Sequence, residues 1–188
     1  MARKTLEEFG VEIGADVVVM GEVVFSQVAN RVDGDYLEQK IKRERDLGIK
    51  HPEKRPRYEI KIKNPVITKQ YAGTPFAEYI EQFFYEMKDG EIRFDAVKVN
   101  SGDKEYPPTF LHLTEDEKVK QIELDGELNQ GQVVQLALRT FGSKEYGNMG
   151  SGLQAILFPQ GEIDYRPRSI DADADAFGYE IASDDLPF

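Results

Sequence analysis

The sequence predicts a mainly β protein, an antiparallel barrel that carries one amphipathic helix and ends in an acidic tail. Short β-prone runs separated by turn residues fill most of the chain, and a single segment has a clear helical period. Strands and helices do not alternate as they would in a parallel sheet. With 188 residues, 40% of them hydrophobic, the chain is long enough for one domain with its own core.

The first two predicted strands have different patterns. Residues 16–29 are β-branched and apolar with Gly21 in the middle, which predicts a long strand with a bend or bulge at the glycine. Residues 57–67 alternate, with Tyr58, Ile60 and Ile62 on the side that we expect to be buried. The opposite, cationic side would carry Arg57, Glu59, Lys61 and Lys63.

A charged insertion at about residues 34–54 separates these strands. Leu37 and Ile41 lie at helical spacing and Gly48 is a stop signal, so residues 34–50 predict a short exposed helix. The whole chain has a net charge of −11, yet residues 40–63 contain ten basic and four acidic residues. This segregation indicates either a surface for a polyanion or a solvated face with its usual charges.

The amphipathic helix has the clearest signals in the sequence. Thr74 suits the N-cap and Pro75 the first helical position, and apolar residues then recur at helical spacing as far as Met87. Asp89 and Gly90 are expected to end it. We interpret its aromatic stripe as part of the core.

The second half of the chain consists of further predicted strands. They span residues 91–99, 109–113, 119–124, 132–141 and 153–158. Many strands around one helix favour an OB-fold-like barrel, and an immunoglobulin-like sandwich is the alternative.

Few residues are suited to catalysis or metal binding. The chain has no cysteine and two histidines, which excludes thiolate metal sites and cysteine nucleophiles. Residues 147–152 lack the spacing of a phosphate-binding loop, and a calcium loop starting at Asp171 fails at Ala176 and Ala182. We expect no enzyme, cofactor or metal; a carboxylate-based, metal-dependent hydrolase or nuclease is a minor alternative.

The candidate nucleic-acid-binding residues combine cations with aromatic rings, because single strands are bound by phosphate contacts and base stacking. Arg139 and Phe141 share the face of strand 132–141 that is not core, and a glycine-rich loop follows them. The predicted set is Arg57, Lys61, Lys63, Arg139, Phe141, Lys144 and Tyr146. Phe25 and Tyr71 are weaker stacking candidates. Packing against a loop or a subunit interface is the alternative for Phe141.

The C-terminal region loses its hydrophobic pattern from residue 160 onward, so we expect a domain over residues 1–165 and a disordered tail over 166–188. The last 18 residues contain six acids and no base. The chain ends in Asp184, Asp185, Leu186, Pro187 and Phe188. An aromatic ring, a terminal carboxylate and two acids make a compact ligand for a basic pocket on a partner protein.

This tip resembles that of bacterial single-stranded DNA-binding proteins, which ends in Asp-Asp, an apolar residue, Pro and Phe. The body lacks that family's tryptophans and its Gln/Pro/Gly-rich linker, and so resembles divergent relatives carried by phages and conjugative elements. The resemblance implies an OB-fold that binds and protects single-stranded DNA without sequence preference. It also implies that the tip recruits replication, recombination and repair proteins.

The sequence also bears on the cellular location of the protein and on alternative functions. The chain has no apolar run of about 20 residues and no secretory signal, which favours the cytoplasm. A protein-interaction adaptor that binds no nucleic acid is the second hypothesis, and a frayed acidic terminus is the alternative for the tip. The sequence leaves open whether the chain forms a homo-oligomer.

Overall fold

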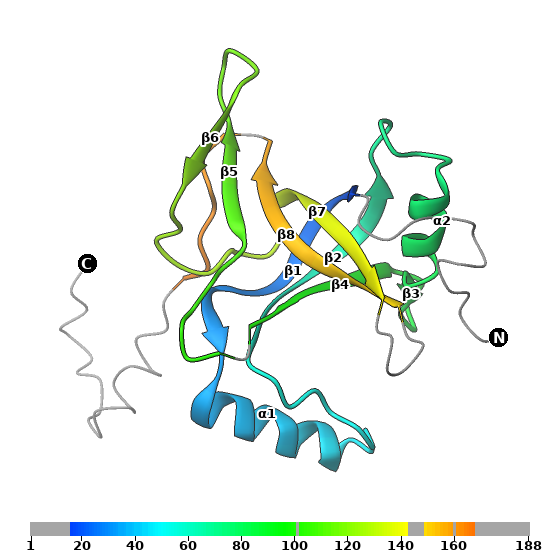
Figure 1. Ribbon diagram of the computed structural model, residues 1–188, viewed down its shortest axis with the longest axis vertical. Coiled ribbons are helices and arrows are strands. Elements are labelled where there is room, and N and C mark those ends of the chain that lie inside the picture. Colours follow the sequence, from blue (N-terminus) through cyan, green and yellow to red (C-terminus); the bar gives the residue numbers. More distant parts are fainter. Residues whose placement is uncertain (1–15, 101, 143–148, 160, 168–188) are drawn as a thin grey trace.

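The computed structural model describes residues 16–100, 102–142, 149–159 and 161–167, and these ranges hold eight strands and two helices (Figure 1). The helices are α1 (Gly34–Asp46) and α2 (Pro75–Glu81). The strands are β1 (Asp16–Val32), β2 (Arg57–Ile67), β3 (Tyr85–Glu86), β4 (Ile92–Val99), β5 (Thr109–Leu113), β6 (Val119–Ile122), β7 (Val133–Gly142) and β8 (Met149–Phe158). The prediction of a mainly β fold is confirmed.

The strands form one sheet in the order β3-β4-β2-β1-β7-β8-β5-β6. All neighbours are antiparallel except β5 and β8. Strand β1 pairs with β7 over Asp16–Glu22 and with β2 along most of its length. Strands β4 and β8, which lie on opposite sides of this central group in the strand order, also contact each other. Strands β1, β2, β4, β7 and β8 therefore curve into a barrel consistent with an OB-like fold. Helix α1 and the β5–β6 hairpin lie at opposite ends of the molecule (Figure 1).

Gly21 allows β1 to bend where it packs closely against its paired strand β2. The register between the two strands shifts between Met20 and Glu22, as the sequence predicts. A Cβ atom at Gly21 would lie 2.8 Å from Ile62 Cδ1 and 2.9 Å from the Lys63 carbonyl oxygen. Only a residue without a side chain permits this close approach.

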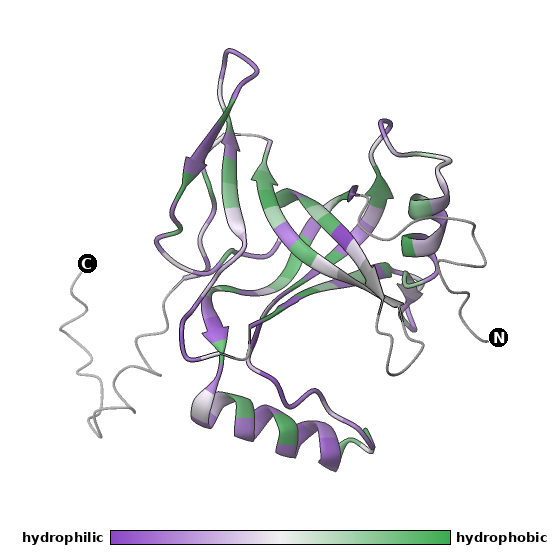
Figure 2. Ribbon diagram, in the orientation of Figure 1, coloured by the Kyte–Doolittle hydropathy of each residue, from purple (hydrophilic) through white to green (hydrophobic). Residues whose placement is uncertain are grey.

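The core fills the inside of the barrel. Alternate residues of β1 and β2 point inward, and Tyr58, Ile60 and Ile62 are buried as the alternation predicts. The other strands of the barrel and α2 complete the core with Phe94, Ala96, Val134, Leu136, Leu138, Leu153, Ile156, Phe158, Ala77, Tyr79 and Ile80. Hydrophobic residues concentrate on the barrel strands, whereas α1 is largely hydrophilic (Figure 2). No helix in the described ranges is long and apolar enough to span a membrane.

Helix α2 begins as predicted but ends early. Thr74 Oγ1 accepts a hydrogen bond from the Ala77 amide at 3.2 Å, which confirms the N-cap. The prediction that the helix continues to Met87 is wrong, because the chain leaves the helix after Glu81 and Tyr85 then pairs with β4. The aromatic stripe still packs on the core, with the ring of Phe84 5.4 Å from that of Phe94.

A buried carboxylate stabilises β1 beyond its pairing with β7. Glu127 accepts hydrogen bonds from Ser26 Oγ at 3.0 Å and from the amides of Val28, Ala29 and Asn30 at 2.9, 2.7 and 2.9 Å. Three consecutive amides converge on one side chain, which a regular strand does not allow. The β1–β2 register shifts in this segment, and Glu127 accepts hydrogen bonds from the backbone amides that have no partner on β2 because of this shift.

Candidate nucleic-acid interface

A row of four side chains crosses the outward face of the sheet from β1 to β3. Phe25 on β1 lies opposite Lys61 on β2, and Lys61 lies opposite Asp95 on β4. The Tyr85 hydroxyl on β3 donates a hydrogen bond to Asp95 Oδ1 at 2.7 Å. We call Phe25, Lys61, Asp95 and Tyr85 the Phe25 row. It places an aromatic ring, a cation and a carboxylate on neighbouring strands.

Two further cations lie near the Phe25 ring, from distant parts of the chain. Lys40 Nζ on α1 is 5.8 Å from the ring centroid, and the Arg166 guanidinium carbon is 5.6 Å from it. Both distances are in the range of cation–π attraction. Lys40 also forms an ion pair with Glu59 on β2, and the Arg166 amide donates to the Glu127 carbonyl at 2.7 Å. The cations are therefore tied to the barrel beside the ring.

A cleft of about 170 Å³ opens along the Phe25 row. It runs between α1 and the outward face of β1, β2 and β4. Its lining combines one aromatic ring, two cations and three carboxylates, and comprises Phe25, Lys40, Glu44, Glu59, Ile60, Lys61, Asp95 and Val97. Such a cleft can accommodate a flat, polar ring that carries a hydrogen-bonding group at its edge.

The neighbouring row of the outward face is also mixed in charge. Lys63 Nζ lies 3.9 Å from Glu22 Oε2, and Arg93 Nε donates to Glu91 Oε2 at 2.7 Å. The hydrogen bond that Arg93 donates to Glu91 raises the pKa of Arg93 above its usual value. The outward face, which we expected to be cationic, therefore also carries carboxylates, with Lys63 beside Glu22 and Arg93 beside Glu91.

Arg57 is buried, with 4% of its surface exposed, whereas we expected it on the solvent side of β2. Its Nε donates to Glu59 Oε2 at 3.1 Å, and its Nη1 donates to the carbonyls of Glu53 and Arg55 at 3.3 Å. The segment before β2 thus covers the guanidinium. Arg57 orients Glu59, which in turn holds Lys40.

Arg139 is exposed on β7 as expected, but at a distance from the two lysines. It lies opposite Asp16, whereas Lys63 lies opposite Glu22, six residues further along β1. At about 3.3 Å per residue these positions are roughly 20 Å apart. The structure therefore does not bring Arg139 together with Lys61 and Lys63.

The remaining predicted residues fall into two groups. Phe141 lies in β7 opposite Gly150, as the strand prediction requires. Its side chain lies outside the described part of the structure, together with Lys144, Tyr146, Asp184, Asp185, Leu186, Pro187 and Phe188. Tyr71 is half-buried and packs against the core, which makes it a poor stacking candidate.

Sequence reasoning missed the contributions of Lys40 and Arg166. Neither residue has a local signal, because Lys40 reaches Phe25 across the gap between a helix and a sheet, and Arg166 follows the last strand. Sequence periodicity reports neighbours within one element and not contacts between distant elements.

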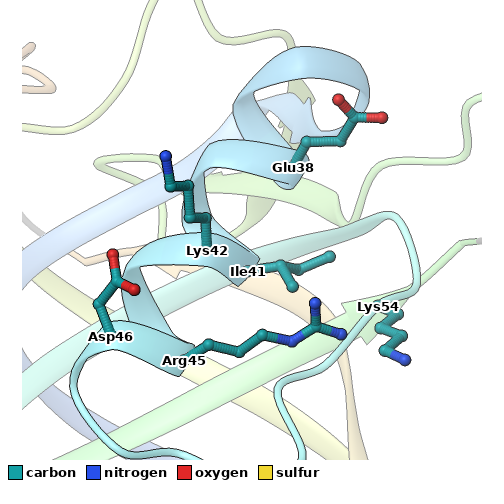
Figure 3. Close-up of a pocket in the computed structure, with 6 residues that line it drawn as sticks. All are labelled: Glu38, Ile41, Lys42, Arg45, Asp46 and Lys54. Atoms are coloured by element: carbon teal, nitrogen blue, oxygen red, sulfur yellow. The ribbon is translucent and has the colours of Figure 1, made fainter.

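A second, larger cleft of about 440 Å³ lies on another side of α1. Its lining residues are Glu38, Ile41, Lys42, Arg45, Asp46 and Lys54. Ile41 and Arg45 extend from the helix toward the segment that carries Lys54 (Figure 3). Leu47 and Ile49 are exposed just after the helix. This charged surface is separate from the Phe25 row.

The side chains of the described ranges contain no group of three histidine, aspartate or glutamate residues arranged to hold a metal ion.

Comparisons with known proteins give similarity in structure and none in sequence. No family model matches the chain, and no curated protein matches it. The single-stranded DNA-binding protein from bacteriophage Enc34 is 14% identical, covers 93% of this chain and 97% of its own, and has a TM-score of 0.43. Its complex with single-stranded DNA gives 14% identity, 86% and 94% coverage, and a TM-score of 0.44. The single-stranded DNA-binding protein gp2.5 of bacteriophage T7 is 9% identical, covers 92% of this chain and 98% of its own, and has a TM-score of 0.44.

Proposed function

We propose that the chain binds single-stranded DNA across the outward face of β1, β2 and β4. The observation that carries this proposal is the ring of Phe25, which lies beside Lys61 on the sheet and within 6 Å of Lys40 and Arg166. A base stacked on an aromatic ring contributes about 1–3 kcal/mol, and neighbouring cations attract the phosphates on either side.

The arrangement suits single strands better than duplexes. Stacking on Phe25 requires a base whose face is free, and duplex bases are already stacked on their neighbours. The cleft of about 170 Å³ beside the ring takes one base at a time.

The other predicted residues have separate roles in this proposal. Lys61 and Lys63 contact phosphates near Phe25, and Arg139 contacts the strand about 20 Å away. That separation is within the reach of the roughly 4–16 nucleotides that one OB-fold binds. We assign Phe141, Lys144 and Tyr146 to the Arg139 end of the path, while Arg57 orients Glu59, which binds Lys40.

The C-terminal segment has a role of its own in the proposal. We take residues 1–165 as the DNA-binding domain and residues 166–188 as an acidic tail, with Arg166 still bonded to Glu127. The tip at residues 184–188 recruits DNA-processing proteins by its terminal aromatic ring and carboxylates. The support for this part of the proposal is the sequence of the tip.

The test is fluorescence anisotropy of a labelled thymidine oligomer and a matched duplex at two salt concentrations. We expect tight, salt-sensitive binding of the single strand and weak binding of the duplex. Phe25→Ala should weaken single-strand binding about tenfold, because a stacking contact is lost. The control is Tyr106→Ala, which removes an exposed ring that also has a lysine beside it, Lys104. Equal losses in both variants would contradict the role of Phe25.

A protein-interaction adaptor remains the second candidate, and the surface of α1 favours it. The larger cleft combines cations with Ile41, and Leu47 and Ile49 are exposed beside it. Such a surface suits an acidic peptide with an apolar side chain. Absence of oligonucleotide binding at low salt would select this candidate and reject DNA binding.

A further inference from the structure

We propose that Asp95 makes the DNA interface prefer bases with an exocyclic amino group, so that cytosine binds more tightly than thymine. The inference rests on the proposed function, since it concerns the edge of a base whose face lies on Phe25. It starts from a carboxylate in a place where a phosphate-binding surface would be expected to avoid one.

Asp95 lies in the middle of the Phe25 row. It is exposed on β4, opposite Lys61, and lines the same cleft as Phe25. Phe25 on β1 and Asp95 on β4 are separated by strand β2, so their backbones are two inter-strand spacings, or about 9.6 Å, apart. A base stacked on the ring extends across Lys61 and presents its edge to the carboxylate.

One oxygen of Asp95 is held in place and the other is available. Tyr85 donates its hydroxyl to Oδ1 at 2.7 Å. Tyrosine is protonated at neutral pH, and burial and the hydrogen bond to Asp95 raise the pKa of Tyr85 further, so its hydroxyl is a donor. Asp95 makes no other hydrogen bond or ion pair with a residue in the described ranges. The carboxylate is thus fixed in orientation with Oδ2 free to accept.

The other two carboxylates of the cleft differ from Asp95. Glu59 uses one oxygen for Lys40 and the other for Arg57. Glu44 lies on α1, on the opposite wall of the cleft, and has no partner that fixes its orientation among the described residues. Asp95 is therefore the carboxylate of this cleft that is both fixed in orientation and free to accept a hydrogen bond.

The chemistry of the base edge decides the direction of the preference. Cytosine presents an N4 amino donor, which a carboxylate accepts, whereas thymine presents the O4 acceptor at the same place. A carboxylate facing O4 is repelled and left without a partner. The carboxylate also repels phosphates, which directs the backbone toward Lys63 and Arg166 and the base toward the cleft.

The experiment compares the affinities of the full chain for labelled oligomers of deoxycytidine, thymidine and deoxyuridine of equal length. Deoxyuridine lacks both the amino group of cytosine and the methyl group of thymine, so it separates the two effects. We expect the cytidine oligomer to bind about fivefold more tightly than the other two, as for one charge-assisted hydrogen bond at a solvated site.

Two variants locate the source of the preference. In Asp95→Asn, Tyr85 still holds Oδ1 and the free group becomes an amide donor, so the ratio of affinities should fall to about 1 or reverse. Glu44→Gln removes the same charge from the same cleft, and should strengthen binding of every oligomer while leaving the ratio unchanged. Both residues lie outside the core, so folded variants are expected.

The outcomes separate this inference from the proposed function. Equal affinities for the three oligomers, a preference that survives Asp95→Asn, or one that Glu44→Gln removes would each overturn the role of Asp95. Failure to bind any oligomer would instead overturn DNA binding, and the role of Asp95 with it.

Discussion

At the scale of single residues, buried polar groups carry much of the order in this protein. Arg57 and Glu127 are both buried, and they make two and three hydrogen bonds to backbone atoms, respectively. A buried charge is tolerated only when its hydrogen-bonding capacity is used. These two residues fix the segments on either side of the Phe25 row.

Glu127→Gln tests this role by changing two oxygens into one oxygen and an amide. The amide group cannot accept, so at least one of the four donors at Ser26, Val28, Ala29 and Asn30 loses its partner. We expect the free energy of unfolding to fall by about 2 kcal/mol, as measured by urea denaturation. Glu123→Gln, an exposed carboxylate four residues earlier, should leave the midpoint unchanged. Equal midpoints for both variants would contradict the role of Glu127.

At the scale of elements, the close approach of β1 and its paired strand β2 holds together the two strands that carry Phe25 and Lys61. This approach depends on Gly21, where the register shifts. The backbone of β2 cannot move aside easily, because β2 is also paired with β4.

Gly21→Ala should therefore destabilise the barrel. The new methyl group would meet the Lys63 carbonyl at 2.9 Å, a backbone atom, as well as the flexible end of Ile62. Overpacking of this kind costs about 1–3 kcal/mol, which a thermal melt resolves as a lower Tm. Gly102→Ala is the matched control, because a Cβ there meets nothing within 4 Å. An unchanged Tm for Gly21→Ala would contradict the close packing of the two strands.

Some elements could be predicted from the sequence and others could not. Residues 57–67 and 109–113 match β2 and β5 in full, because alternation is a local signal. The predicted end of α2 is wrong because the pairing of Tyr85 with Arg93 on β4 overrides helix propensity. Lys40, Arg166 and buried Arg57 depend on contacts between distant segments, which no local pattern reports.

At the scale of the whole molecule, charge is separated along the chain. The net charge is −11, and the last 18 residues supply six of the negative charges without any base. The Phe25 ring, in contrast, has three cations near it, Lys40, Lys61 and Arg166. If the chain binds DNA as proposed, we expect a tail of this charge to compete with DNA phosphates for those cations.

A chain that ends at Arg168 should bind a thymidine oligomer more tightly than the full chain does. The truncation removes six negative charges and no positive ones beyond residue 168. The gain should be largest at low salt and should diminish as salt screens the charges. The measurement is the same anisotropy titration for both chains. Weaker binding by the truncated chain would contradict the competition.

The central position of β1 in the sheet also has a consequence for local opening. This strand is the hydrogen-bonded link between the β2–β4 half and the β7–β8 half of the barrel. Amide protons on the part of β1 that pairs with both neighbours can exchange with solvent only when the two halves separate. We therefore expect them to exchange at the rate of global unfolding, so that the strand bearing Phe25 is among the last to open.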